Sequence, residues 1–339
     1  MRDKEYFWYM LANAPGFGPK SIHYIYKNLQ TDNLSIRDLF KLDTEELSRR
    51  FPEIGRSKFS KTNFSCLAEL ETNNKLYNTF EKLTSDGVSI IGLDDDRYPK
   101  FVLKSMGDSA PSILYCKGYL PLLDQKGVAV VGARDIGEFE TTTTKTIAKE
   151  LAKNGINVIS GYAKGVDTSA HLGALQAQGT TTMILSFGIN HITVRKELKD
   201  KDWEKNALFV SQFEPYEKFS GVNAMIRNRL ICAMSKAIVV IKSGPEKDNS
   251  GKMSGTFNTA KTALQMNIPV FVLSPKILNP TPQGNVDLIK IGAIEFSDTA
   301  EILKHLEEQP QKEQLDVSGQ SIVNGKIDEP YQTNLFEAH

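Results

Sequence analysis

Two stretches of the chain place glycines and a cation directly after a run of apolar, β-branched residues. The first is Gly132-Ala133-Arg134, and the second is the run Ser160-Gly161-Tyr162-Ala163-Lys164-Gly165. Glycines permit a tight strand-to-helix turn, and the free amides at the start of the next helix can receive an anion. We therefore expect a phosphate site that uses the charges of Arg134 and Lys164. The loop residues expected to shape or contact it are Gly132, Ser160, Gly161, Tyr162 and Gly165.

Two further segments add cations near the same predicted edge of the fold. Arg227 and Arg229 are two residues apart on an expected helix, so they point about 200° apart. We expect one to reach the site and the other to anchor structure. Lys252 lies in a run rich in glycine and hydroxyl side chains before another expected helix. It is therefore a further candidate contact by position.

Other readings of these residues compete with phosphate binding. Tyr162 is expected either to stack a nucleic-acid base or to pack in the core. Asp167 and His171 lie four apart on one helix face, which suits either acid–base catalysis or a carboxylate that favours the helix dipole. The sequence has no Ser-His-Asp set, metal-spaced His/Cys cluster or Walker-type loop. We therefore predict a binding protein with no catalytic residue, metal or cofactor.

From about residue 84, short β-branched runs alternate with helical segments, which predicts an α/β domain with a doubly wound, mainly parallel, Rossmann-like sheet. Expected strands lie near 88–91, 113–116, 128–131, 156–160, 181–187, 208–212, 237–241 and 270–273. Expected helices lie near 141–153, 166–178, 222–234 and 255–266. Loops at the carboxyl ends of such strands meet where the strand order reverses, so this edge would collect the candidate residues.

The regions on either side of this domain have a different residue pattern. Residues 1–82 show apolar positions at helical spacing, interrupted by Pro15-Gly16-Phe17-Gly18. This turn suits either half of a DNA-binding helix-hairpin-helix or a plain helix connection. Residues 83–306 would form the Rossmann-like domain, and the polar tail 307–339 is predicted to be disordered. The tail carries Gln332, Leu335 and Phe336, which match a peptide that docks on the bacterial sliding clamp.

Composition constrains the class of protein. The chain has 339 residues and 41 basic against 41 acidic side chains, so any nucleic-acid site must be a local basic groove. Three widely spaced cysteines, Cys66, Cys116 and Cys232, indicate a reducing compartment. No run reaches the length of a membrane span, and the start has no secretory pattern. We expect a cytoplasmic protein with no membrane association.

The order of these motifs resembles the DprA/Smf family of DNA-processing proteins. The similarity runs from about residue 85 to 306. It rests on Gly-Ala-Arg at 132–134, the Ser-Gly-x-Ala-x-Gly-Val-Asp run at 160–167, Ala-His at 170–171, Phe-Glu-Pro at 213–215, Arg-Asn-Arg-Leu-Ile at 227–231 and Gly-Asn at 284–285.

The resemblance implies an extended Rossmann fold that binds single-stranded DNA, forms a homodimer and works with a RecA-type recombinase in transformation. It places DNA contacts at Arg134, Lys164, Arg227 and Arg229. The N-terminal helices would correspond to a small helix-hairpin-helix or SAM-like domain.

This sequence also departs from the family pattern. Residues 190–193 replace a usual Tyr-Pro pair, Lys242 replaces a common acidic residue, 244–249 form an insert, and a C-terminal winged helix is missing. These departures leave alternatives open, namely a role in phage defence or beside a neighbouring toxin or effector. A nucleotide-binding enzyme or sensor that uses the same pocket is a further alternative.

Overall fold

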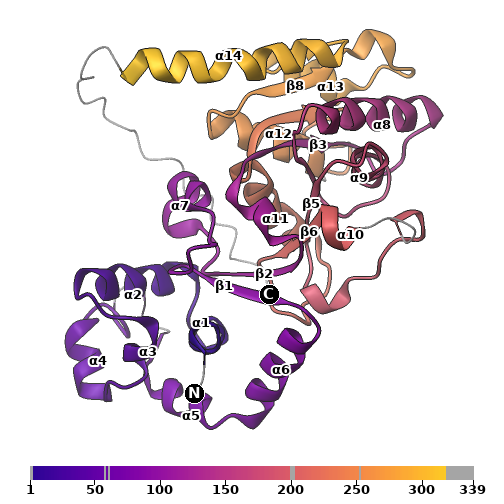
Figure 1. The fold of residues 1–339 in the computed structure, drawn as a ribbon. Coiled ribbons are helices and arrows are strands. Elements are labelled where there is room, and N and C mark those ends of the chain that lie inside the picture. The colour runs from indigo at the N-terminus through magenta and orange to yellow at the C-terminus, as the bar shows by residue number, and fades with distance from the viewer. Residues whose placement is uncertain (1–2, 57–58, 60–61, 199–202, 252, 318–339) are drawn as a thin grey trace. The chain divides into compact units, whose positions relative to one another are not determined.

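In the computed structural model, residues 3–56, 59, 62–198, 203–251 and 253–317 are described (Figure 1). Residues 1–299 form one compact unit, and the residues from 300 onward form a second. Each unit is described by itself.

Helices make up the N-terminal region, as predicted. Apolar side chains recur at helical spacing, and N-cap side chains such as Asp43 and Asn73 accept bonds from the first turns of their helices. The helices are α1 (Lys4–Ala12), α2 (Pro19–Thr31), α3 (Ile36–Leu39), α4 (Thr44–Arg50), α5 (Ser65–Glu71) and α6 (Asn74–Ser85).

The sheet follows, and its described strands are nine. They are β1 (Ser89–Gly92), β2 (Ile113–Gly118), β3 (Gly127–Val131), β4 (Val158–Ser160), β5 (Thr181–Ile184), β6 (Ala207–Ser211), β7 (Ser235–Val240), β8 (Val270–Leu273) and β9 (Ile294–Phe296). The connecting helices are α7 (Lys100–Met106), α8 (Glu138–Lys153), α9 (Val166–Gln176), α10 (Trp203–Asn206), α11 (Gly221–Ala233), α12 (Gly255–Gln265) and α13 (Gln283–Lys290).

The strand order is β1-β2-β6-β5-β4-β3-β7-β8-β9. Strands β3 to β9 pair in parallel, whereas β1 and β2 add an antiparallel edge beside β6. Helices α8 and α9 pack together beside β3 and β4, and α11 and α12 pack together beside β7 (Figure 1). The chain therefore winds outward in both directions from β3, which confirms the doubly wound prediction and puts the order reversal between β3 and β7.

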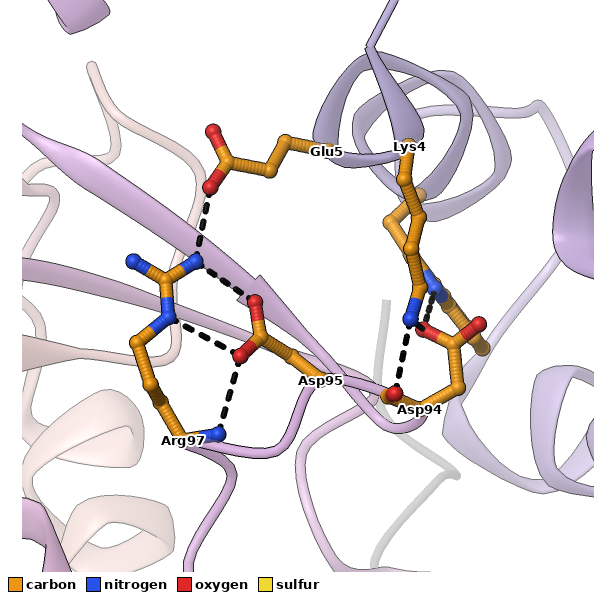
Figure 2. Close-up of polar contacts among 6 residues, drawn as sticks. Lys4, Glu5, Asp94, Asp95 and Arg97 are labelled. Carbon is orange, nitrogen blue, oxygen red and sulfur yellow. Dashed lines mark hydrogen bonds and ion pairs between the residues drawn. The ribbon is translucent and has the colours of Figure 1, made fainter.

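Polar contacts tie the first helix to the loop after β1 (Figure 2), and the aromatic side chains of this helix are buried. The Arg97 guanidinium bonds to Glu5 on α1 at 2.7 Å and to Asp95 at 2.6 Å. Burial raises the pKa of Asp95, but the bonds from Arg97 outweigh it and the net shift is downward. Trp8 donates its indole N–H to Asp94. The helical region and the sheet therefore belong to the same compact unit.

The described part of the second unit is helical. Helix α14 spans Thr299–Val317, so the start of the segment predicted to be disordered, residues 307–317, is a helix. The rest of that prediction, residues 318–339, lies outside the described residues. Among the described helices, none is long and apolar enough to cross a membrane.

Candidate nucleic-acid site at the strand-order reversal

A cavity of about 650 Å³ opens at the carboxyl ends of β3 and β7, where the strand order reverses. Its walls come from the loop after β3, the N-terminal end of α9, one side of α11, the loop after β7 and the start of α12. Five segments far apart in the chain therefore meet at the edge that the sequence predicted. The volume lies in the range typical of small-ligand sites.

Arg227 forms a buried cationic wall of this cavity. It is 7% exposed, and its Nη1 donates to the carbonyl of Ile184 at 2.6 Å. Its Nε is also buried, with no hydrogen-bond partner among the described groups. Burial lowers the pKa of this guanidinium, and the carboxylate of Asp167 opposes that shift. A buried donor without a partner is costly, so this atom is suited to a ligand acceptor.

Gly161 is required by the packing of this arginine. A Cβ at this position would lie 2.1 Å from Arg227 Nη1 and 2.5 Å from Asp167 Oδ2. The loop of residues 160–165 therefore packs directly against the Arg227 guanidinium. Asp167 also lines the cavity and accepts a bond from the amide of Ala163 at 3.2 Å.

Arg134 lies at the mouth of the cavity. It is exposed, and its guanidinium carbon lies 5.4 Å from the ring centre of Phe219. Gly165 brings the two loops together, since it has a φ of 78° and packs against the carbonyls of Ala133 and Arg134. Lys164, which precedes it, is exposed at the tip of the second loop. Gly132 lines the cavity beside Arg134.

Other predicted residues do not line this cavity. Arg229 is exposed on α11 and is not part of the wall, so Arg227 is the member of the pair that faces the cavity. Ser160 is fully buried, and its hydroxyl donates to the carbonyl of Val130 at 2.6 Å, so it bonds within the sheet. Lys252 and the tail residues Gln332, Leu335 and Phe336 lie outside the described residues.

Tyr162 takes the packing role of its two readings. It is 9% exposed, and its ring stands edge-on to Phe209 with centroids 5.6 Å apart.

His171 is likewise structural. It is fully buried, and its Nε2 lies 2.6 Å from the carbonyl of Gly161. Burial lowers the pKa of His171 and so favours the neutral ring. An acid–base pair of Asp167 and His171 facing the cavity is therefore not what the structure shows.

Sequence reasoning missed several groups of the cavity rim. Phe219 and Met253 line the cavity and are exposed, and Val222 and Ile226 are exposed on the neighbouring face of α11. Asn228, buried in the wall, donates to the carbonyl of Gly255 at 3.2 Å. The signal was present at Phe219, an aromatic residue inside a polar run. No cluster of three metal-ligating side chains occurs within the described ranges.

Lys242, the unusual residue after β7, has a buried partner. Its Nζ lies 2.7 Å from Oε1 of Glu140 on α8, whose side chain is 7% exposed. The second oxygen of Glu140 accepts from the amide of Gly137 at 3.0 Å and caps the helix. The bond from Lys242 is the main cause that lowers the pKa of Glu140, and burial opposes it. The pair therefore connects the first turn of α8 to the residue that follows β7, at the end of the sheet where the cavity lies.

This ion pair predicts a pH-dependent contribution to stability. A carboxyl group whose pKa is lowered on folding stabilises the protein above its unfolded pKa, and the contribution is lost as pH falls through the folded pKa. A double-mutant cycle of Lys242→Met and Glu140→Gln, followed by urea unfolding, should give a coupling energy of about 1–3 kcal/mol at neutral pH. The coupling should be smaller at an acid pH below the ordinary pKa of a glutamate than at neutral pH, and it should keep falling as the pH is lowered further. Equal couplings at the two pH values would contradict the assignment.

Comparisons with known proteins agree with this fold. Residues 89–307 match the family model of DNA recombination-mediator protein A. The chain is 29% identical over 237 residues to DNA processing protein DprA of Bacillus subtilis, an alignment that covers 69% of this chain and 77% of that one. It is 32% identical over 220 residues to protein Smf of Escherichia coli, covering 64% of this chain and 56% of the relative.

Solved structures give the same result. DNA processing protein A of Streptococcus pneumoniae superposes with a TM-score of 0.69 at 24% identity, over 90% of this chain and 98% of the other, and shows the shared fold. DNA processing protein A of Helicobacter pylori, studied for its single-stranded DNA binding mode, gives a TM-score of 0.55 at 28% identity. That match covers 66% of this chain and 96% of the other. This chain is thus a member of the DNA recombination-mediator protein A family, the DprA/Smf proteins.

Proposed function

We propose that this protein binds single-stranded DNA in the cavity between β3 and β7 and passes it to a RecA-type recombinase. The observation that carries the proposal is Arg227, a buried cation that lines the cavity and whose Nε has no partner among the residues that the structure describes. A phosphate oxygen is a suitable acceptor for such a donor. The single-stranded DNA binding studied in the Helicobacter pylori relative supports the same ligand.

The other predicted contacts have roles that follow from their positions. Arg134 would hold a phosphate at the cavity mouth, and Lys164 would attract the backbone at the loop tip. Phe219, 52% exposed and already paired with Arg134, offers a face on which a base can stack. Arg229 is proposed as an outer contact that adds charge along the path of the strand, and Lys252 stays a candidate from its position in the sequence.

The ligand that suits these groups is a single strand. In a duplex the bases are stacked inside the helix, and their faces are closed to side chains. The exposed apolar rim beside the cations combines the stacking surface and charge that single-strand binders use. We propose binding without catalysis, since His171, the partner of Asp167 in the acid–base alternative, is fully buried and does not line the cavity.

The biological setting is part of the proposal. A homodimer and RecA as the partner are what the resemblance implies, whereas a cytoplasmic location is the expectation from the cysteine content of the sequence. The tail motif adds the sliding clamp as a further candidate partner, and a neighbouring toxin or effector remains the alternative for a defence role.

Binding of fluorescent oligo-dT, measured against a duplex of equal length across a salt series, tests the proposal. We expect preference for the single strand and a linear fall of log affinity with log salt, because phosphate contacts release counterions. A thermal-shift series with dTMP and ATP serves as the comparison arm. Stabilisation by a mononucleotide without oligo-dT binding at low salt would replace the proposal with a nucleotide sensor.

A further inference from the structure

A second cavity, of about 430 Å³, lies at the carboxyl ends of β4 and β5. Its wall combines two aromatic rings with three basic side chains and one aliphatic residue: Tyr162, Phe187, His191, Arg195, Lys196 and Val194. Five of its seven lining residues lie between 191 and 196, next to and partly within the stretch 190–193 where this sequence departs from the usual Tyr-Pro pattern.

The wall is held in place by specific bonds. The Arg195 guanidinium carbon lies 4.8 Å from the ring centre of Tyr162, and Nη2 donates to the Tyr162 carbonyl at 2.8 Å. The Tyr162 hydroxyl donates to the carbonyl of Thr193 at 2.9 Å and accepts from the Arg195 amide at 3.1 Å. The segment 193–195 is therefore fastened to the loop after β4. The Nε of Arg195 is buried, with no partner among the described groups.

The two cavities share the loop after β4 as a common partition. Tyr162 lines the second cavity, and the next residue, Ala163, lines the first. Lys164 follows and is exposed. A strand that leaves the first cavity across this loop therefore meets a cation at its tip and the second cavity on its far side.

We propose that the second cavity takes a further nucleotide of the same DNA strand, an inference that rests on the proposed function. The half-buried Phe187 and Val194 receive the base, and Arg195 and Lys196 hold its phosphate. Aromatic faces beside cations are the combination that binds single strands without sequence preference. The volume lies within the range of sites that enclose small ligands.

The test is the dependence of affinity on strand length, with oligo-dT from about 4 to 16 nucleotides. Lys196→Glu is the variant, since Lys196 is exposed and the substitution leaves the Tyr162 contacts in place. Lys149→Glu, at an exposed position on α8 that lines neither cavity, is the control of equal charge change. We expect Lys196→Glu to weaken the longer strands about tenfold and to leave the shortest binding strand within about twofold of wild type.

Other outcomes separate the two proposals. An equal loss at every length, or no loss beyond that of Lys149→Glu, would overturn the second site alone. Failure of wild type to bind any length would overturn the proposed function and this inference with it. A second readout is photocrosslinking of oligo-dT that carries one 5-iododeoxyuridine. Crosslinks in the peptide that contains residues 187–196 support the site, and their absence at every labelled position overturns it.

Discussion

Replacing Arg134 with glutamate is expected to weaken oligo-dT binding by about 10- to 100-fold at low salt. The exposed guanidinium stands at the mouth of the cavity, and a charge-assisted bond to phosphate contributes about 1.5–3 kcal/mol. The slope of log affinity against log salt should also decrease by about 1, because one phosphate contact is lost. Fluorescence anisotropy across a salt series measures both quantities.

Lys149→Glu is the matched control, because it changes net charge equally on the exposed side of α8. The melting temperature of both variants should stay close to wild type, since both side chains are exposed. If the two variants lost affinity equally, the change in net charge would explain the loss. Arg134 would then not be a DNA contact.

Replacing Gly161 with alanine is expected to lower both stability and DNA affinity. The new Cβ would lie 2.1 Å from Arg227 Nη1 and 2.8 Å from its Cζ, so the guanidinium must move. Overpacking of this kind costs about 1–3 kcal/mol in the free energy of unfolding. Displacing Arg227 removes a second charge-assisted contact, so affinity should fall at least about tenfold. Urea unfolding and anisotropy check the two effects on one preparation.

Gly221→Ala separates crowding from the general effect of adding a methyl group. Gly221 opens α11, and a Cβ there would have no atom within 4 Å. The free energy of unfolding of the Gly221→Ala protein should equal or slightly exceed that of wild type, because alanine favours the helix more than glycine does. A Gly161→Ala protein that is destabilised but binds oligo-dT normally would show that Arg227 is not a DNA contact.

The sheet was predictable because its strands are buried on both faces and read as continuous apolar runs. Residues 127–131, buried throughout, are an example, and the prediction 128–131 matched them closely. Strand β9 was missed because Ile294–Phe296 is short and partly exposed, so it gives no such run. The division at residue 82 stays a prediction, since α1 packs directly against the sheet edge.

The sequence could predict only those features of the site that depend on local backbone chemistry, such as glycine turns and residue spacing on a helix. Glycines beside cations pointed to two loops that reach the cavity, and the i, i+2 spacing agrees with Arg227 in the cavity wall and Arg229 outside it, while the DNA contacts themselves stay predictions. Local sequence could not show that the Ser160 hydroxyl bonds within the sheet or that Tyr162 is covered by Arg195. Those contacts join segments about thirty residues apart, so they depend on strand order. Phe219 was assigned to the site for the first time by the fold, which also places Asp167 in the lining but not His171.

The incompletely bonded guanidinium of Arg227 links folding to ligand binding. Folding removes this cation from water, and within the described part of the chain its Nε gains no partner, so the desolvation cost lowers the stability of the protein. The ligand then meets a cation that is already dehydrated and oriented, and the association step avoids most of the cost. An apolar residue at this position would avoid that cost of folding but would leave the cavity without its buried donor.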